Sequence, residues 1–157
     1  MKRHAILVID MLNDFVGEKA PLRCPGGEKI IPDLQKLFAW VRERNARGLD
    51  DVQLVHIQEA HRKNDADFRV RPVHAVKGTW GSDFIKELYP QGEEYIVPKR
   101  RHSGFAHTDL DLYLREENIS FNMELNKEEI QSLLKMTPHY WKSTPENKTK
   151  LEEIDSL

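Results

Sequence analysis

Residues 5–15, which read AILVIDMLNDF, decide the fold of this chain. Five consecutive apolar residues, three of them β-branched, are typical of a strand buried on both faces in the middle of a parallel sheet. Asp10 follows at the carboxyl end of this strand, where open α/β sheets bind their ligands. A carboxylate is costly to bury without a partner. Asp10 is therefore either a functional group or a capping residue of the turn, and the strand alone leaves both readings open.

The length and charge of the chain exclude several classes of protein. Its 157 residues suit one domain with a real core, and a net charge of −2 offers no electrostatic attraction to nucleic acid or to a membrane surface. No apolar run approaches the length of a membrane span, and the first residues, MKRH, lead into a strand and not into a signal peptide. The single cysteine, Cys24, fits a reducing cytoplasm. We expect a cytoplasmic protein with no nucleic-acid or membrane partner.

The apolar pattern predicts a three-layer α/β domain with a parallel sheet. Leu34, Phe38 and Val41 recur at three- and four-residue steps, as on one face of a helix, and the apolar runs before and after them read as strands. A strand, a helix and a strand in this order form a right-handed parallel crossover. The predicted strands are residues 4–9, 51–57 and 94–97, and the predicted helices are residues 29–47, 81–89 and 109–117.

Polar side chains with metal-ligand chemistry follow the second predicted strand. Glu59 and His61 come at its end and His74 lies further along, and carboxylate and imidazole groups together suit a divalent transition metal. Spacing this loose is a weak signal. We expect no tightly bound metal, with His61 and His74 making structural or substrate contacts instead.

The third predicted strand leads into a basic run, residues 99–105, which read KRRHSGF. Such a run is either an anion site or, more commonly, a solvated face. Parallel strands present their carboxyl ends on one side of the sheet, so we expect Asp10 and Lys99 within salt-bridge reach at the ends of adjacent strands. We expect Phe15, His61 and Arg101 around this pair. The charge of Lys99 should then lower the pKa of Asp10.

Cys24 lies in a loop, residues 16–27, that is rich in glycine and proline. A thiol next to a cation such as Arg23 could be activated. A loop cysteine with no partner in the sequence is more often incidental, and we expect this for Cys24.

Three motifs in order carry a family resemblance: IDMLNDF at residues 9–15, PVHAVKGT at 72–79 and KRRHSGF at 99–105. Over residues 1–119 the chain resembles the isochorismatase-like cysteine hydrolases, and most of all their N-carbamoylsarcosine and ureidoacrylate amidohydrolase branch. The resemblance implies a Rossmann-like αβα fold and hydrolysis of a small amide or ureido substrate by an Asp-Lys-Cys triad. Asp10 would match the general base and Lys99 the cation that activates the nucleophile. Phe15, His61 and Arg101 would contact substrate.

The chain departs from this family where the nucleophile is expected. Ile119 is followed by SFNMELN at residues 120–126, and no cysteine occurs after Cys24. The resemblance therefore implies a domain that is inactive alone. The alternative is a non-catalytic binding or assembly module that retains the old pocket.

Residues 120–157 are expected to form a separate helical extension of different character, joined to the hydrolase-like part by fusion or divergence. Residues 133–142, LLKMTPHYWK, resemble a segment near the end of bacterial rRNA guanine methyltransferases. The tail has no glycine-rich turn for a nucleotide cofactor, so an accessory role in methyl transfer is the third and weakest reading. The free edge of the first strand needs a cover. We expect residues 121–125 or a second subunit there, and hence a homo-oligomer.

Overall fold

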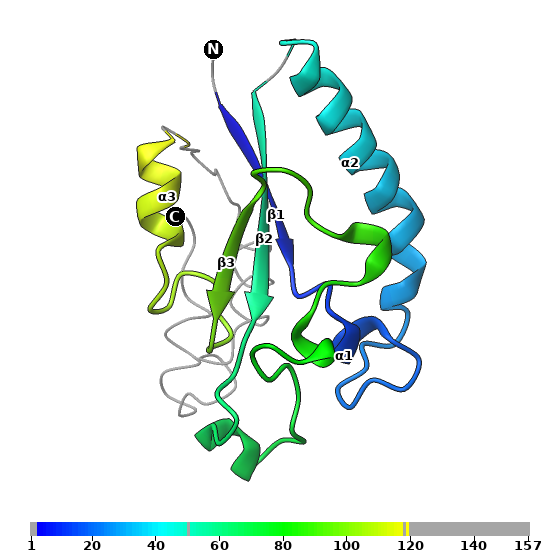
Figure 1. Cartoon of the computed structure of the whole chain (residues 1–157), viewed down its shortest axis with the longest axis vertical. Coiled ribbons are helices and arrows are strands. Elements are labelled where there is room, and N and C mark those ends of the chain that lie inside the picture. The colour runs from blue at the N-terminus through cyan, green and yellow to red at the C-terminus, as the bar shows by residue number, and fades with distance from the viewer. Residues whose placement is uncertain (1–2, 50, 118, 120–157) are drawn as a thin grey trace, which may run out of the picture. The chain divides into compact units, whose positions relative to one another are not determined.

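A parallel three-stranded sheet forms the centre of the structure, a computed structural model that describes residues 3–49, 51–117 and 119 (Figure 1). Helices flank it in an αβα arrangement, which confirms the predicted fold class. In chain order the elements are β1 (His4–Ile9), α1 (Asn13–Val16), α2 (Ile31–Ala46), β2 (Val52–Glu59), β3 (Tyr95–Lys99) and α3 (Leu110–Glu116).

Among the described residues, the first strand has the expected free edge, but it is not buried on both faces. The described sheet has the order β1-β2-β3, so β2 is its central strand and β1 lies at an edge. In β1 only Val8 is buried, and Ile9 is 56% exposed. The prediction of a first strand buried on both faces is therefore wrong for the part of the chain that the structure describes. The apolar run indicates a strand, but run length alone does not distinguish a central from an edge position.

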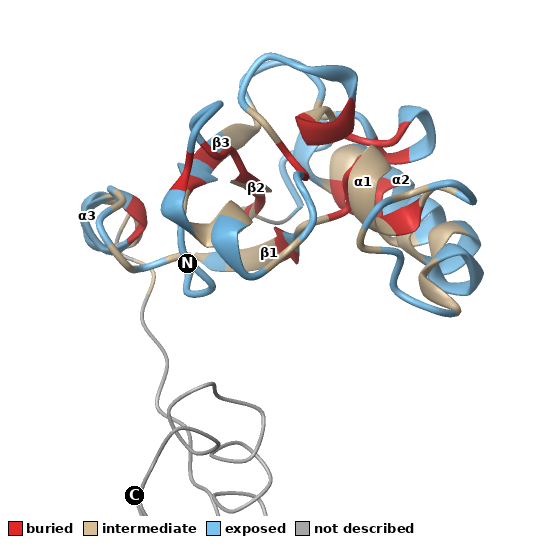
Figure 2. Cartoon of the chain, turned by 90° about the horizontal axis from the view of Figure 1, so that it is seen from below, coloured by how far each residue is buried: buried red, intermediate tan, exposed pale blue. Residues whose placement is uncertain are grey.

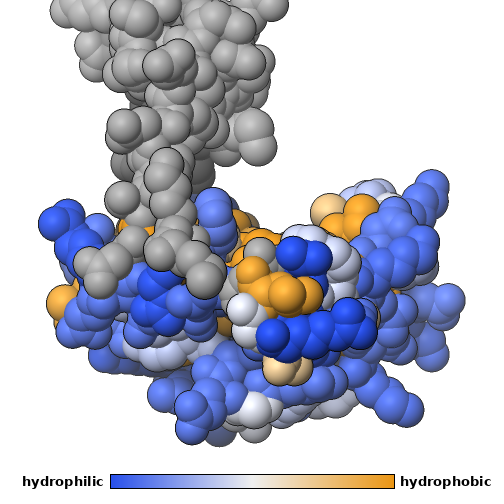
Figure 3. Space-filling view, turned by 90° about the horizontal axis from the view of Figure 1, so that it is seen from above, coloured by the Kyte–Doolittle hydropathy of each residue, from blue (hydrophilic) through white to orange (hydrophobic). Residues whose placement is uncertain are grey.

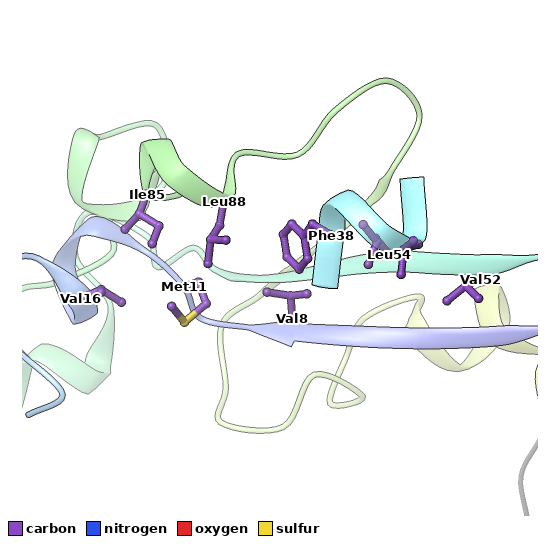
Figure 4. Close-up of a cluster of buried hydrophobic side chains, with 9 residues drawn as sticks. Val8, Met11, Val16, Phe38, Val52, Leu54, Ile85 and Leu88 are labelled. Carbon is purple, nitrogen blue, oxygen red and sulfur yellow. The ribbon is translucent and has the colours of Figure 1, made fainter. Parts of the chain in front are cut away.

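Alternating side chains of the strands face two separate apolar layers. On one face Val8, Leu54 and Phe38 pack between the sheet and α2, together with residues of the loop that precedes β3 (Figure 4). On the other face Val55 and Val97 pack against Leu110 of α3. This two-residue alternation is what a strand with both faces covered requires.

The prediction of a helix over residues 81–89 is wrong. Two short 3₁₀ turns, Trp80–Ser82 and Lys86–Leu88, stand there with extended chain between them. The extended part bonds to the segment after β1: Ile85 N–H donates to Met11 O at 3.1 Å, and Asp83 O accepts from Asn13 N–H at 3.0 Å. These long-range hydrogen bonds replace those that a helix would have formed within the segment.

The other two predicted helices are present. In α2, Pro32 lies in the first turn, and Gly48 just past the end has a φ of 66°, a left-handed conformation that glycine adopts without strain. Leu110 N–H, at the start of α3, donates to the Thr108 hydroxyl at 3.3 Å. The predicted helical tail over 120–157 and the strand over 121–125 lie outside the described residues. Among the described helices, none has the length and apolar character to cross a membrane.

The amino ends of the strands are closed by polar contacts. Asn45, in α2, donates to Val52 O at 2.7 Å and accepts from Val52 N–H at 3.1 Å, so one amide group joins the end of α2 to the start of β2. Arg3 pairs with Asp51 at 2.6 Å and also with Glu117. Seen from this end, the described surface is mostly hydrophilic with scattered apolar side chains (Figure 3).

One histidine is buried in the core, away from the carboxyl ends of the strands. The His56 ring is inaccessible to solvent and packs edge-on against Phe38 and Phe84, with ring centroids 5.6 and 5.5 Å away. Its Nε2 lies 3.0 Å from Glu94 Oε2, and Glu94 also pairs with Arg42 at 2.7 Å. Burial lowers the pKa of His56 and outweighs the opposing effect of the Glu94 hydrogen bond.

This burial predicts an acid-sensitive fold. Because the folded pKa of His56 lies below the unfolded value, the unfolded chain takes up the proton first, and the free energy of unfolding falls as the pH drops. His56→Gln keeps a donor toward Glu94 but cannot titrate. In urea unfolding between about pH 8 and pH 5.5, this variant should lose less stability than the wild type. Equal pH slopes for the two proteins would contradict the prediction.

Candidate functional site

Asp10 and Lys99 meet over the carboxyl end of β2. Lys99 Nζ lies 2.7 Å from Asp10 Oδ2, and Lys99 is only 2% exposed. The other Asp10 oxygen accepts the Glu59 N–H at 3.1 Å. The predicted salt bridge is therefore confirmed. The prediction that it joins adjacent strands is wrong, because β2 runs between β1 and β3 and the two side chains reach each other across its end.

The backbone at Asp10 is held in an unusual conformation. Its φ of 55° is left-handed, a region that aspartate tolerates better than most residues. The Asp10 N–H still donates to Ile57 O at 3.0 Å, which continues the β1–β2 pairing by one residue. This turn ends β1 and places the carboxylate over β2.

The pKa of Asp10 is raised, and the prediction that Lys99 would lower it below its ordinary value is wrong. Burial is the largest cause of the increase, and the nearby Glu59 carboxylate adds to it. Lys99 opposes both through its charge and its hydrogen bond, but does not outweigh them. The sequence showed the cation that would face Asp10, whereas the degree of burial became visible only in the fold.

Glu59, His61 and His74 form a buried cluster next to this pair. One ligand atom from each lies within 4.8 Å of the others. Glu59 Oε1 is 3.2 Å from His61 Nε2, and Glu59 Oε2 is 3.7 Å from His74 Nε2. Neither ring nitrogen makes a hydrogen bond in these positions. Figure 2 looks onto the carboxyl ends of the strands, where the buried segments gather.

The tautomer of His74 suits a ligand role. Its Nδ1 lies 2.7 Å from Pro72 O, a carbonyl that can only accept, so Nδ1 carries the proton. In the neutral ring Nε2 then has a free lone pair, and this is the atom that points toward Glu59. Metal-bound histidines are commonly oriented by such a bond on the other nitrogen. The donor set of the cluster therefore fits a divalent transition metal.

Of the residues predicted to surround Asp10 and Lys99, two lie in or against the histidine cluster and one lies at its rim. His61 is part of the buried cluster, and the Phe15 ring packs edge-on against His74 at a centroid distance of 5.8 Å. The Arg101 side chain is 53% exposed and lies 3.6 Å from the carboxylate of Asp65. Arg101 therefore belongs to the rim of the cluster.

Asp65 is a site residue that the sequence analysis missed. Its side chain is 1% exposed and accepts two hydrogen bonds from Arg100, at 2.8 and 3.0 Å. It also lies 3.3 Å from His61 Nδ1. The Arg100 hydrogen bonds hold the pKa of Asp65 well below its usual range. A carboxylate in the middle of a loop follows no strand end and fits no motif, so only Arg100 in the basic run hinted at a partner.

Cys24 is exposed, and its backbone N–H donates to Phe15 O at 2.8 Å. The loop that carries it therefore runs beside Phe15, whereas Lys99 is buried. That Cys24 is not a nucleophile stays a prediction.

The curated relatives of this chain include hydrolases as well as a protein described as inactive. The chain is 32% identical over 127 residues to the "Probable inactive nicotinamidase At3g16190" of Arabidopsis thaliana, with 74% of this chain and 61% of the relative covered. It is 28% identical over 137 residues to a ureidoacrylate amidohydrolase of Stutzerimonas stutzeri, with 73% and 54% covered. The chain thus spans between about half and three fifths of the length of these relatives.

Solved structures agree with the family shown by the sequence. An isochorismatase-like hydrolase from Alkaliphilus metalliredigens is 82% identical, with a TM-score of 0.70 over 76% of this chain and 63% of that one. N-carbamoylsarcosine amidase from Thermoplasma acidophilum is 30% identical, with a TM-score of 0.62 over 76% and 64%. The zinc complex of pyrazinamidase from Pyrococcus horikoshii is 28% identical, with a TM-score of 0.62 over 76% and 67%. Residues 4–123 match the isochorismatase domain, and the chain belongs to this family of hydrolases.

Proposed function

We propose that the chain binds a small amide or ureido compound over the Asp10–Lys99 pair. The buried 2.7 Å contact between these side chains carries the proposal, because it places a proton acceptor and a cation together at the carboxyl end of the sheet. Two family members are named for ureido substrates and a third for an amide. We assign substrate contacts to Phe15 and Arg101, which supply an aromatic ring and an exposed guanidinium, and to His61 only where the cluster holds no metal ion.

The Asp10–Lys99 pair would supply the proton acceptor and the cation of a hydrolytic reaction, but not its nucleophile. Asp10 would accept a proton from a nucleophile and return it to the leaving nitrogen, and Lys99 would stabilise the charges that develop between these steps. A thiolate beside the Lys99 ammonium would have a lowered pKa and would complete an Asp-Lys-Cys triad. The one cysteine of this chain is the exposed Cys24. We therefore propose that this chain binds but does not hydrolyse on its own.

A non-catalytic binding or assembly module is the second candidate. The observation that favours it is the same missing thiol, together with a family member described as a probable inactive nicotinamidase. The two candidates differ in ligand binding: a retained substrate pocket predicts affinity for ureido acids or amides, whereas an assembly module predicts none.

We also propose a divalent transition metal at Glu59, His61 and His74. Buried imidazole nitrogens without hydrogen bonds support it, and they give a reason to revise the expectation of no metal, which rested on the loose sequence spacing and on the resemblance to the amidohydrolase branch. The related pyrazinamidase was solved as a zinc complex. When bound, the ion would act as a Lewis acid toward a carbonyl oxygen. Without an ion, Lys99 Nζ, 3.8 Å from Glu59 Oε1, is the nearby cation.

A cytoplasmic homo-oligomer remains part of the proposal. The outer edge of β1 has no strand partner among residues 3–49, 51–117 and 119, and Ile9 at its end is 56% exposed. A second copy on this edge would pair its free backbone groups and cover the apolar side chains. The net charge of −2 supports a site for small molecules over one for nucleic acid.

Removing the Lys99 charge should destabilise the fold. Lys99→Met leaves the carboxylates of Asp10 and Glu59 without their cation, and we expect the free energy of unfolding to fall by about 1–3 kcal/mol in urea titrations. Arg115→Met is the matched control: the Arg115–Asp111 pair is 77% and 61% exposed, so its loss should cost less than about 0.5 kcal/mol. Equal effects of the two substitutions would show that the Asp10–Lys99 pair adds no more than a surface pair.

Ligand binding without turnover is the test of the proposed function. Calorimetry with a panel of ureido acids and carboxamides should detect binding that weakens in Asp10→Asn, and product assays should detect no hydrolysis. Cys24→Ser should bind like the wild type. Hydrolysis that disappears in Cys24→Ser would refute the role given to Cys24, and absence of binding across the panel would favour the assembly module.

Metal content tests the cluster separately. Protein purified without chelator should contain about one zinc, iron or manganese ion per chain, and His74→Ala should lose it because the set keeps only two of its three ligands. Elemental analysis of both proteins gives the answer. A metal-free wild type that also fails to take up zinc on dialysis would restore the expectation of no metal.

A further inference from the structure

The carboxylate of Asp14 reaches across the chain to a strained backbone position. Asp14 Oδ2 accepts the Ala75 N–H at 2.8 Å, which links α1 to the loop 61 residues later. Ala75 is completely buried and has a φ of 42°, a left-handed conformation that costs an alanine free energy. Such a conformation persists only where surrounding contacts hold it.

The residue that Asp14 holds is bound on its other side to the histidine cluster. Ala75 O accepts the His61 N–H at 2.8 Å, and His61 O accepts the Lys77 N–H at 2.9 Å. Ala75 is thus fixed between Asp14 and His61, and His74 directly precedes it. The turn at Ala75 therefore constrains the backbone next to His74, whose ring is also held by its Nδ1 bond to Pro72 O.

The chain also leaves space for this carboxylate at Gly81. A Cβ atom at Gly81 would overlap the Asp14 carboxylate. Gly81 is buried, and no left-handed φ demands a glycine there. A glycine is required at this position because the Asp14 carboxylate approaches its backbone closely.

Stabilisation of α1 is the simpler explanation of Asp14, and the contacts argue against it. Asp14 lies in the first turn of α1, where a carboxylate could bond to the helix's own free amides. The Asp14 carboxylate accepts its hydrogen bond from Ala75 instead, and the cap residue of this helix, Leu12, makes no side-chain bond.

We propose that Asp14 is a positioning residue, which holds the left-handed turn at Ala75 and thereby fixes His74 against Glu59 and His61. The positioning stands on the contacts alone. Its consequence for metal binding rests on the proposed function of the cluster.

Asp14→Ala tests the positioning directly in the full chain. Without the carboxylate, the Ala75 amide should exchange with solvent faster and the ring resonances of His74 and His61 should shift in NMR spectra of metal-free protein. The affinity for Co²⁺, followed by its visible absorption, should fall about tenfold or more, as for other residues that orient metal ligands. Asp14→Asn keeps an acceptor oxygen and should restore most of the wild-type behaviour.

Gly81→Ala supplies an independent route to the same change. Its methyl group should displace the Asp14 carboxylate, so Gly81→Ala alone should reproduce the ring shifts and the faster Ala75 exchange of Asp14→Ala. Combining the two substitutions should add little to either, because both remove the same contact. Asn45→Ala is the control: it removes two comparable hydrogen bonds at the amino end of the sheet and should leave the His74 ring unchanged.

The outcomes separate the two proposals. Unchanged Ala75 exchange and His74 resonances in Asp14→Ala would overturn the positioning role, as would equal shifts in Asn45→Ala. Wild-type protein that does not bind Co²⁺ would refute the metal site, while the exchange and resonance measurements would still decide whether Asp14 positions His74.

Discussion

The ion pair between Asp10 and Lys99 is the constraint on which the carboxyl end of the sheet depends. An ammonium that is 2% exposed is costly to remove from water unless carboxylates lie close to it. The strand register provides this: Ile9 pairs with Ile57 and Glu59 with Lys99, so three strands end at nearly the same level. A shift of one strand by one residue would turn its charged side chain to the opposite face. The ion pair therefore forms only in this strand register, and it stabilises this register over shifted ones.

Glu59 links this pair to the histidine cluster. One oxygen, Oε1, is 3.8 Å from Lys99 Nζ and 3.2 Å from His61 Nε2, while the other faces His74. Two carboxylates, those of Asp10 and Glu59, thus face the single ammonium of Lys99, and the imidazole nitrogens that make no hydrogen bond face the Glu59 carboxylate. The same imbalance helps to raise the pKa of Asp10, since the Glu59 carboxylate contributes to that increase.

The sequence predicted the convergence of Asp10 and Lys99 because two local facts sufficed: each follows an apolar run, and parallel strands end on one side. It did not predict that β2 separates them, because an apolar run carries no information about its neighbours. The prediction of a helix over residues 81–89 was wrong for a related reason. Phe84, Ile85 and Leu88 are buried as their spacing suggested, but hydrogen bonds to Met11 and Asn13 satisfy the backbone in an extended form. Those partners lie about 70 residues away and leave no local signal.

Two carboxylates outside the strands, Asp65 in a loop and Asp14 in α1, add contacts to those of the residues at the strand ends. Asp65 binds Arg100, 35 residues away, and lies beside His61 Nδ1, while Asp14 binds the Ala75 amide next to His74. His61 thus lies beside a carboxylate only four residues further along the chain, whereas His74 precedes a residue that is held by a carboxylate 61 residues away. Parallel strands end on one side of a sheet, and this general rule predicts from the sequence that the charged residues at strand ends lie together. Orientation of the two rings depends on contacts that follow no such rule, some local, such as the His74 Nδ1 bond to Pro72 O, and some long-range, such as the Asp14 bond to Ala75, so the sequence alone does not predict how far the cluster is preorganised.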